Sequence, residues 1–403
     1  MANEAQIAAP AVLQVVPRLD AGGVEQTTLD MARALIAAGG RAVVATSGGR
    51  LVPELEAMGA SVEIIPAATK NPYGMAANIL RLRHIAQGHR VDIVHARSRA
   101  PAWSARAAAR GLGLPFVTTY HGIYTARTAL KRRYNAIMAS GDVVIANSRY
   151  TARHIAEAHG VPLSRIVTIP RGTDMTRFDP AAVDHAAREA LRADWGAKEG
   201  ERVILLPARL TRWKGQEVFL DALALLSGRD APPWRAVLAG DHQGRTDYRD
   251  ALTARAEAAG IGGRVHLAGH VADMPLAYAA ADLVISPAVE PEAFGRVAVE
   301  AQAMAKPVIV ADHGGATETV KAEGEGVTGW RTPPGDAEAL ARAMAQALAL
   351  TPEERAELGA RARAFVAERF SVGAMTRATL DVYRGLMRRR QEERRKGSPS
   401  GEG

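Results

Sequence analysis

Short apolar runs alternate with helix-length segments along most of the chain, in two successive series. Runs of this kind are typical of strands that are buried on both faces of a parallel sheet. A chain that alternates such strands with helices predicts an α/β fold, with helices on both sides of each sheet. The strands of the first series are predicted at 12–16, 42–46, 62–66, 92–96, 116–121, 142–148 and 166–170, and those of the second at 202–208, 234–240, 265–271, 283–287 and 307–312.

The two series predict two Rossmann-like, doubly wound domains, because 403 residues exceed what one hydrophobic core usually supports. We expect an N-terminal domain at 1–182 and a second domain at 196–370, separated by a polar, charge-mixed stretch. A helix is predicted at 371–390, and a basic, Gly/Ser-containing tail at 391–403 is expected to be disordered. Ligands of such folds gather at the carboxyl ends of the strands, so we expect them in a cleft between the domains.

Charge is distributed unevenly along the chain. Residues 1–190 contain 22 Lys+Arg against 14 Asp+Glu, whereas residues 191–383 contain 22 against 26. A basic first half suits a polyanionic partner, either nucleic acid or an anionic membrane. Nucleic acid is disfavoured because zinc-finger, RNP and basic-zipper patterns are missing and only 5% of residues are aromatic. With no secretory signal and no long apolar run, we expect a cytoplasmic protein; the absence of cysteine excludes disulfides and thiolate metal sites.

Two glutamates, Glu292 and Glu300, flank a glycine-broken turn that leads into an Ala-rich helix, expected from Phe294 to Met304. Over that helix the two carboxylates lie at most about 12 Å apart along its axis, the length of a sugar–diphosphate–ribose unit. The amides of Gly295, Arg296 and Val297 lack intrahelical acceptors and can bind a diphosphate. The alternative, two ordinary solvated acids, is weakened by the apolar character of the rest of this helix. We count Phe294 among the substrate-binding residues as well.

Three further motifs lie at the carboxyl ends of predicted strands. Arg209 and Lys214 precede a helix and can bind a leaving diphosphate, although a pair of surface cations is the alternative. Gly22 and Gly23 would let the backbone approach a ligand closely, unless they serve only the turn. His121 ends a strand and can hydrogen-bond a sugar hydroxyl or stabilise charge at the reacting carbon.

The segment 124–140 predicts a basic amphipathic helix. Leu130, Tyr134, Ile137 and Met138 recur at helical spacing, and Lys131, Arg132 and Arg133 lie off that line. Such a helix can bind an anionic membrane surface. The alternative is an ordinary helix whose apolar stripe packs into its own domain.

With these motifs, nearly the whole chain resembles the retaining GT-B glycosyltransferases of family 4, which include lipopolysaccharide-core and phosphatidylinositol mannosyl enzymes. The resemblance is carried by GGVEQ, HG, RLTRWKG, GHV, PEAFGRVAVEAQAMAKPVI and GGATE. It implies a GT-B fold whose C-terminal helix returns to the N-terminal domain. AGDHQGR at 239–245 departs from the usual G-x-G-P pattern, so contacts there stay open.

The resemblance also assigns roles to residues. Glu292 contacts the donor sugar near the reacting centre, Glu300 binds the ribose hydroxyls, and Arg209 and Lys214 hold the diphosphate. His121 meets the sugar. In the same way, the Gly22–Gly23 turn approaches the phosphates or the acceptor, and the backbone near His270 and Val271 contacts the base.

The expected function is retaining, metal-independent transfer of a hexose or N-acetylhexosamine from a nucleotide-diphosphate sugar, without a bound cofactor. The expected acceptor is lipid-linked or a lipopolysaccharide core, reached by peripheral binding to the inner face of the cytoplasmic membrane, for cell-envelope glycan biosynthesis. The alternatives are a GT-B epimerase or phosphorylase and a non-catalytic nucleotide-sugar-binding subunit. The donor base, the sugar, the acceptor and the oligomeric state stay open.

Overall fold

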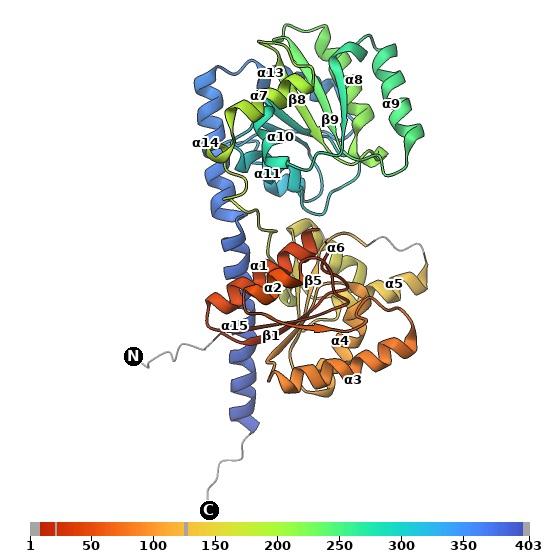
Figure 1. The fold of residues 1–403 in the computed structure, drawn as a ribbon, viewed down its shortest axis with the longest axis vertical. Coiled ribbons are helices and arrows are strands. Elements are labelled where there is room, and N and C mark those ends of the chain that lie inside the picture. Colours follow the sequence, from red (N-terminus) through yellow and green to blue (C-terminus); the bar gives the residue numbers. More distant parts are fainter. Residues whose placement is uncertain (1–8, 21, 125–127, 398–403) are drawn as a thin grey trace, which may run out of the picture. The chain divides into compact units, whose positions relative to one another are not determined.

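The computed structural model describes residues 9–20, 22–124 and 128–397, which form two compact units. Unit 1 combines the chain up to Gly172 with Val372 onward, and unit 2 comprises Thr173–Ser371. Each unit contains one parallel sheet covered by helices on both faces (Figure 1). This is the doubly wound α/β architecture that the alternation of strands and helices predicts.

Unit 1 contains a seven-stranded sheet in the order β3-β2-β1-β4-β5-β6-β7. Its strands are β1 (Ala11–Val15), β2 (Arg41–Thr46), β3 (Ser61–Ile64), β4 (Ile93–Ala96), β5 (Phe116–Tyr120), β6 (Val143–Ala146) and β7 (Ile166–Thr168). The helices are α1 (Gly23–Ala37), α2 (Val52–Ala57), α3 (Pro72–Gly88), α4 (Arg99–Gly111), α5 (Ala129–Asn135), α6 (Arg149–His159) and α15 (Val372–Gly397), with 3-10 turns η1 (Ala136–Ala139) and η2 (Leu163–Arg165). The strand order reverses between β1 and β4, which is where such sheets usually bind ligands.

Unit 2 contains a six-stranded sheet in the order β10-β9-β8-β11-β12-β13, which reverses between β8 and β11. Its strands are β8 (Arg202–Pro207), β9 (Trp234–Ala239), β10 (Val265–Gly269), β11 (Leu283–Ser286), β12 (Val308–Ala311) and β13 (Trp330–Thr332). The helices are α7 (His185–Asp194), α8 (Gln216–Ser227), α9 (Thr246–Ala258), α10 (Met274–Ala280), α11 (Arg296–Ala303), α12 (Ala316–Thr319), α13 (Ala337–Leu348) and α14 (Pro352–Arg369), with 3-10 turns η3 (Pro180–Ala182), η4 (Arg212–Lys214) and η5 (Gly262–Arg264).

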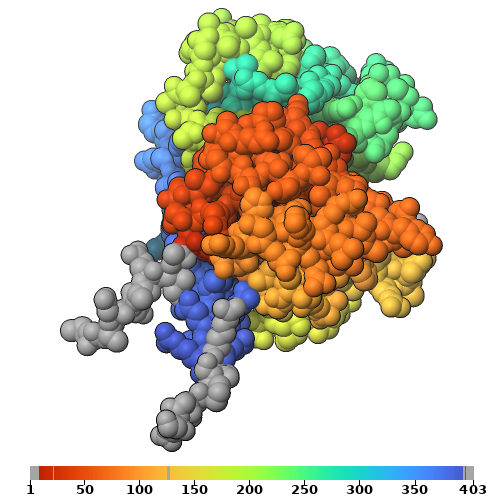
Figure 2. Space-filling view, turned by 60° about the horizontal axis from the view of Figure 1, so that its bottom comes forward, coloured from red at the N-terminus to blue at the C-terminus, as the bar shows by residue number. Residues whose placement is uncertain are grey.

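Side chains alternate between the two faces of the unit 1 sheet, and each face has its own apolar core. Leu13 and Val15 pack on the side of α3 and α4, whereas Val12 packs on the side of α1 and α2. Helix α15 closes this second face, since Leu380 and Tyr383 belong to the same core as residues of α1. Figure 1 shows α15, in blue, beside α1, and Figure 2 shows its surface next to that of the first hundred residues. The helix predicted at 371–390 therefore returns to the N-terminal unit.

The boundaries differ from the predicted ones at two places. Residues 173–195, expected to belong partly to the first domain, are part of unit 2, because Phe178 and Trp195 are buried in its core. Helix α15 continues to Gly397, so residues 391–397, which were expected to be disordered, are helical. Their sequence is dominated by Arg and Glu, which are good helix formers, and the preceding helix spares them the cost of nucleation.

Candidate active site

The loop after β8 contains both predicted cations of unit 2, Arg209 and Lys214. It ends at Gly215, which has a φ of +76° and is the N-cap of α8. A β-carbon on Gly215 would lie 2.0 Å from the carbonyl oxygen of Pro287, so glycine alone allows this loop to pack against the loop after β11. The two loops thus meet at the point where the strand order of unit 2 reverses.

Lys214 and Glu292 form an ion pair between these two loops. The Nζ atom of Lys214 lies 2.5 Å from Oε1 of Glu292, and the two side chains are 16% and 10% exposed. The ammonium group also lies 4.3 Å from the centre of the Trp213 ring. The backbone of Glu292 is held in place, because its carbonyl oxygen accepts a hydrogen bond of 2.7 Å from the Gly315 amide. The structure therefore brings together two predicted site residues that are 78 positions apart.

Arg209 does not join this pair. Its side chain is exposed, and among the described residues its guanidinium group has neither a hydrogen-bond acceptor nor a salt-bridge partner. Its backbone is fixed, since the carbonyl oxygen accepts a 2.9 Å hydrogen bond from Nε2 of the buried Gln216. Arg209 is thus a free cation on a well-anchored loop.

Glu300 is buried, with 7% of its surface exposed, and both of its carboxylate oxygens have partners. Oε1 accepts hydrogen bonds from Arg296, the shorter at 2.6 Å, and Oε2 accepts one of 2.9 Å from the Tyr278 hydroxyl. The carboxylate raises the pKa of the Arg296 guanidinium, and burial together with Glu300 raises that of Tyr278. Glu300 is therefore not a solvated surface acid.

Helix α11 begins later than predicted, at Arg296, with Gly295 as its N-cap at a φ of +96°. The amides of Arg296 and Val297 are in its first turn, where α-helical geometry supplies no acceptor. The Phe294 side chain, expected to bind substrate, packs in the core at 5.8 Å from the Phe370 ring. The Phe294 side chain is therefore part of the core of unit 2.

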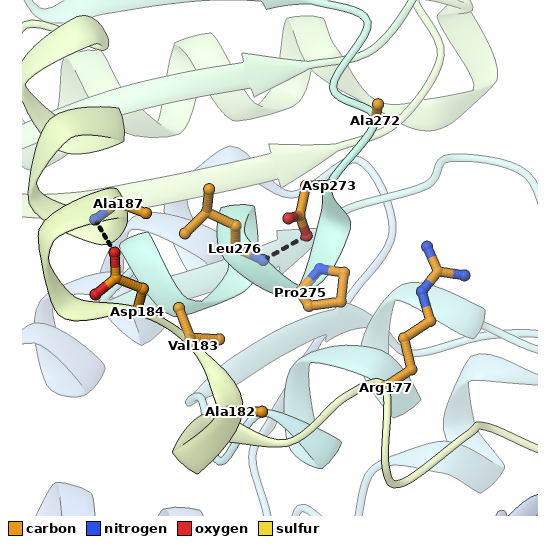
Figure 3. A pocket seen from close by; sticks show the side chains of 9 residues that line it. All are labelled: Arg177, Ala182, Val183, Asp184, Ala187, Ala272, Asp273, Pro275 and Leu276. Carbon is orange, nitrogen blue, oxygen red and sulfur yellow. Dashed lines mark hydrogen bonds between the residues drawn. The ribbon is translucent and has the colours of Figure 1, made fainter.

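The predicted base-contacting residues His270 and Val271 lie in the loop after β10, with His270 exposed. The same loop continues into the wall of a pocket of about 610 Å³, which Arg177, Val183 and Leu276 also line (Figure 3). Leu276 belongs to α10, the helix whose Tyr278 binds Glu300. Helix α10 thus contributes to both the pocket and the Glu300 cluster, through residues two positions apart. Sequence reasoning missed Arg177, since nothing in its surroundings resembles a motif.

In unit 1, the predicted glycine turn precedes α1. Gly22 is the N-cap of α1 with a φ of +139°, a value that favours glycine, and its carbonyl oxygen accepts a hydrogen bond of 3.1 Å from Gln26. Gly23 is the first residue of the helix. This turn follows β1, one of the two strands at which the sheet order reverses.

His121 follows β5 directly, as predicted. Among the described residues, neither ring nitrogen has a hydrogen-bond partner, although both are enclosed by the protein. Burial lowers the pKa of the imidazole well below its usual value, and the positive charges of Arg171 and Arg97 lower it further. His121 is therefore neutral near pH 7, with one nitrogen able to donate a hydrogen bond and the other able to accept one.

More polar side chains lie near His121 than the sequence predicted. His95 is fully buried, with Nδ1 2.6 Å from the Tyr383 hydroxyl and Nε2 2.7 Å from Oγ1 of Thr119. Arg97 is 2% exposed, and its Nε donates a 2.8 Å hydrogen bond to Gln14. The sequence does contain one signal for these residues, because each is a polar residue at the end of an apolar strand. The sequence does not specify the strand order that brings them close to His121.

The segment 124–140 does not form one amphipathic helix. Residues 125–127 lie outside the described part, and the rest forms α5 followed by η1. Ile137 and Met138 are buried in the unit 1 core, whereas Leu130 is 79% exposed. The predicted stripe is therefore divided between the core and the surface. No helix in the described residues is both long and apolar enough to cross a membrane.

Two family models match the chain. The model for glycosyl transferases group 1 matches residues 187–365, and that for Glycosyltransferase Family 4 matches residues 21–177. The "D-inositol 3-phosphate glycosyltransferase" of Xylanimonas cellulosilytica is 30% identical over 405 residues, which cover 92% of this chain and 93% of that protein. The protein of the same name from Kineococcus radiotolerans is 33% identical over 271 residues, 64% of this chain and 60% of that protein.

Solved structures agree with these relatives. A glycosyltransferase from Rickettsia africae is 33% identical, covers 94% of this chain and 98% of its own, and superposes with a TM-score of 0.83. HepE of Anabaena, solved in complex with UDP, is 28% identical, covers 93% of this chain and 100% of its own, and has a TM-score of 0.78. Relatives match this chain over more than nine-tenths of their own length, and both of its sheets are doubly wound. The chain therefore belongs to the GT-B glycosyltransferases of group 1 and family 4.

Proposed function

We propose that this glycosyltransferase moves a hexose or N-acetylhexosamine from a nucleotide-diphosphate sugar, with retention of configuration, to a hydroxyl group of a phosphorylated acceptor. Unit 2 binds the donor and unit 1 binds the acceptor. The single observation that carries the proposal is the Lys214–Glu292 ion pair at the switch point of unit 2.

The ion pair suits a donor that brings its own negative charge. A diphosphate competes with Glu292 for the Lys214 ammonium, and Arg209 on the same loop supplies a second, unpaired cation. Glu292 is then free to accept hydrogen bonds from sugar hydroxyls. As the sugar–phosphate bond breaks, the charge on the leaving diphosphate grows, and fixed cations together with the first-turn amides of α11 stabilise it.

Glu300 and the neighbouring pocket suit the nucleoside. A carboxylate held by Tyr278 and Arg296 has lone pairs left for the two ribose hydroxyls. The pocket beside α10 has room for a planar base, with the Arg177 guanidinium available to stack on it. HepE, at 28% identity, was solved with UDP and with UDP-glucose, so uridine is the base we propose.

We consider two classes of acceptor. A lipid-linked or lipopolysaccharide-core acceptor fits the basic residues Lys131, Arg132 and Arg133, which are exposed beside the exposed Leu130. This acceptor would place the enzyme on the cytoplasmic face of the membrane, in cell-envelope glycan synthesis. A soluble phosphorylated cyclitol is the second class, because curated relatives are named D-inositol 3-phosphate glycosyltransferases. Co-sedimentation with vesicles of anionic or of purely zwitterionic lipid separates them, since only the first class requires binding to anionic vesicles.

We further propose that transfer needs no metal ion or cofactor, because Lys214, Arg209 and the α11 terminus already provide positive charge where the diphosphate would lie. Retention follows if the leaving phosphate itself helps to deprotonate the acceptor hydroxyl on the same face. Activity that survives EDTA, and a product with the anomeric configuration of the donor by NMR, would support these points. Loss of transfer in EDTA that Mg²⁺ restores would refute the first.

The decisive experiment compares UDP-, GDP- and ADP-sugars by thermal shift and then follows each stabilising donor with and without acceptors. A ligand at 100 times its dissociation constant raises the free energy of unfolding by about 2.7 kcal/mol. Transfer to a phosphorylated acceptor supports the proposal. Epimerised sugar with donor alone would indicate an epimerase, and tight binding without turnover on any acceptor would indicate a binding subunit. If no nucleotide sugar stabilises the protein, the proposal is wrong.

A further inference from the structure

A row of polar side chains crosses one face of the unit 1 sheet at its carboxyl end. His95 and Arg97 lie two residues apart on the strand β4 and its extension, and Thr119 and His121 do the same on β5. Strand register pairs His95 with Val117 and Thr119 with Ile145, so alternation places all four on the face covered by α1 and α15. Below the row, this face is apolar. The row is therefore a local departure from a hydrophobic core.

Several atoms in this row and beside it have no partner among the described residues. They are Nη2 of Arg97, both ring nitrogens of His121 and Oδ1 of Asn147, the residue that directly follows β6; all are enclosed by protein. Arg97 and Asn147 are each 2% exposed. Buried polar atoms are almost always hydrogen-bonded, so four unsatisfied atoms in one place indicate that something else completes them.

The charge of Arg97 is a stronger indication that a binding partner is missing. Its guanidinium group has one hydrogen bond, to the neutral Gln14 side chain, and no salt bridge within the described part of the chain. Burial lowers the pKa of Arg97, and the opposing electrostatic effects of Tyr383 and then Asp30 are smaller. A buried cation without a paired anion is strongly unfavourable.

An arginine that stabilises the fold of this protein has more partners than Arg97. Arg363, in unit 2, donates to the carbonyl oxygens of Phe178 and Ala303 and to the carboxylate of Asp179. Its guanidinium joins three segments and balances a charge. Arg97 is more deeply buried than Arg363, yet in the described part of the chain its guanidinium group bonds only to Gln14. Its position also matters, because it follows β4 directly at the switch point beside β1.

We propose that Arg97 binds a phosphate group of the acceptor, and that Asn147 binds a hydroxyl group of the same molecule. The proposal rests on the proposed function, which assigns the acceptor to unit 1. The chemistry follows from the free atoms: a guanidinium fork matches phosphate oxygens, and Oδ1 of Asn147 needs a donor such as a hydroxyl. The acceptor class is therefore a phosphorylated polyol or sugar.

The test uses the full chain, with inorganic phosphate as the probe and without donor or acceptor. Calorimetric titration at low ionic strength should show millimolar phosphate binding to the wild type and at least about 10-fold weaker binding to Arg97→Gln. Arg33→Gln, on the exposed face of α1, is the matched control and should bind phosphate as the wild type does. Phosphate binding that is equal in wild type and Arg97→Gln would overturn the proposal.

Stability gives a second, independent readout. If Arg97 is reserved for a ligand, Arg97→Gln removes an unpaired buried charge, so its melting temperature without phosphate should equal or exceed that of the wild type. Phosphate should then raise the melting temperature of the wild type but not of the variant. A large drop in the melting temperature of Arg97→Gln would mean that Arg97 is structural. Arg97→Lys keeps the charge, so it should fold and retain part of the phosphate binding. If folded Arg97→Lys binds phosphate as tightly as the control Arg33→Gln, the guanidinium fork has no role in binding.

Binding of UDP identifies the source of the phosphate. Arg97→Gln should bind UDP as tightly as the wild type, because the donor is assigned to unit 2. An equal loss of UDP and phosphate affinity would show that the phosphate is the donor's, and would overturn the acceptor assignment. A wild type that binds phosphate through Arg97 but never binds UDP would instead refute the proposed function and leave the anion site standing.

Discussion

The two units present their polar groups in opposite states. In unit 2 the predicted site residues are paired with one another, as Lys214 with Glu292 and Arg296 with Glu300. In unit 1 the corresponding groups, those of Arg97, His121 and Asn147, contain atoms that find no partner within residues 9–20, 22–124 and 128–397. A paired site is stable by itself and must exchange partners when a ligand binds. An unpaired site is poorly stable until the ligand arrives. The difference predicts that substitutions in unit 2 cost both activity and stability, whereas those in unit 1 cost mainly binding.

The largest expected effect is on turnover. Glu292→Gln keeps a hydrogen-bond acceptor for Lys214 but loses the carboxylate charge, so sugar transfer should fall by at least about 100-fold. Glu290→Gln, in the same loop but exposed, is the control and should leave transfer unchanged. Steady-state rates with a saturating donor measure both. Near-normal turnover of Glu292→Gln would contradict the role of this carboxylate.

Lys214→Met tests whether pairing in unit 2 stabilises the fold. It leaves the Glu292 carboxylate largely buried without its cation, so the free energy of unfolding should fall by about 2 kcal/mol. The double variant Lys214→Met/Glu292→Gln should recover part of that loss, because its remaining amide is neutral. Denaturant unfolding of the four proteins gives the coupling energy of the pair. Strictly additive losses would show that the two side chains do not stabilise one another.

Acid should weaken the protein through the buried histidines of unit 1. Burial lowers the pKa of His95 and His121, so the unfolded chain binds protons more readily than the folded one below about pH 6.5. The free energy of unfolding should therefore fall as pH drops below that value, by up to about 1.4 kcal/mol per pH unit for each group. His95→Gln should flatten the curve, with the exposed His270→Gln as control. A wild-type curve that is flat between pH 7 and 5 would refute this reading.

The smallest expected effect concerns Glu300. Tyr278→Phe removes one hydrogen bond to its carboxylate, which should weaken donor binding about 5-fold and lower stability by about 1 kcal/mol. Isothermal titration with UDP measures the first quantity and thermal unfolding the second. The exposed Tyr73, replaced by Phe, is the control. Unchanged UDP affinity would mean that Glu300 does not depend on Tyr278 for its position.

The fold could be predicted from the sequence because its signal is local. Each predicted strand overlaps an observed one, since buried parallel strands are short apolar runs that need no partner to be recognised. The boundary at Thr173 was missed because it depends on where Phe178 and Trp195 are buried. Nothing in their immediate sequence specifies that core.

The site was only partly predictable for the same reason. Glu292, Glu300 and Lys214 were found from their spacing, but the pairing of Lys214 with Glu292 depends on two loops that meet through Gly215. Arg97 was missed because a single arginine after a strand is unremarkable in a basic half-chain. Only the strand order places it beside β1.

The return of α15 to unit 1 has a consequence for biosynthesis. Tyr383 and Leu380 complete the core on one face of the first sheet and are translated after every residue of unit 2. On the ribosome, the domain that starts first is therefore finished last. Helices α1 and α2 can cover their part of that face early, but the part under α15 waits exposed while some two hundred further residues emerge. Nascent-chain stalling before and after residue 386 should reveal this wait as protease-sensitive unit 1 that becomes resistant only in the longer chain.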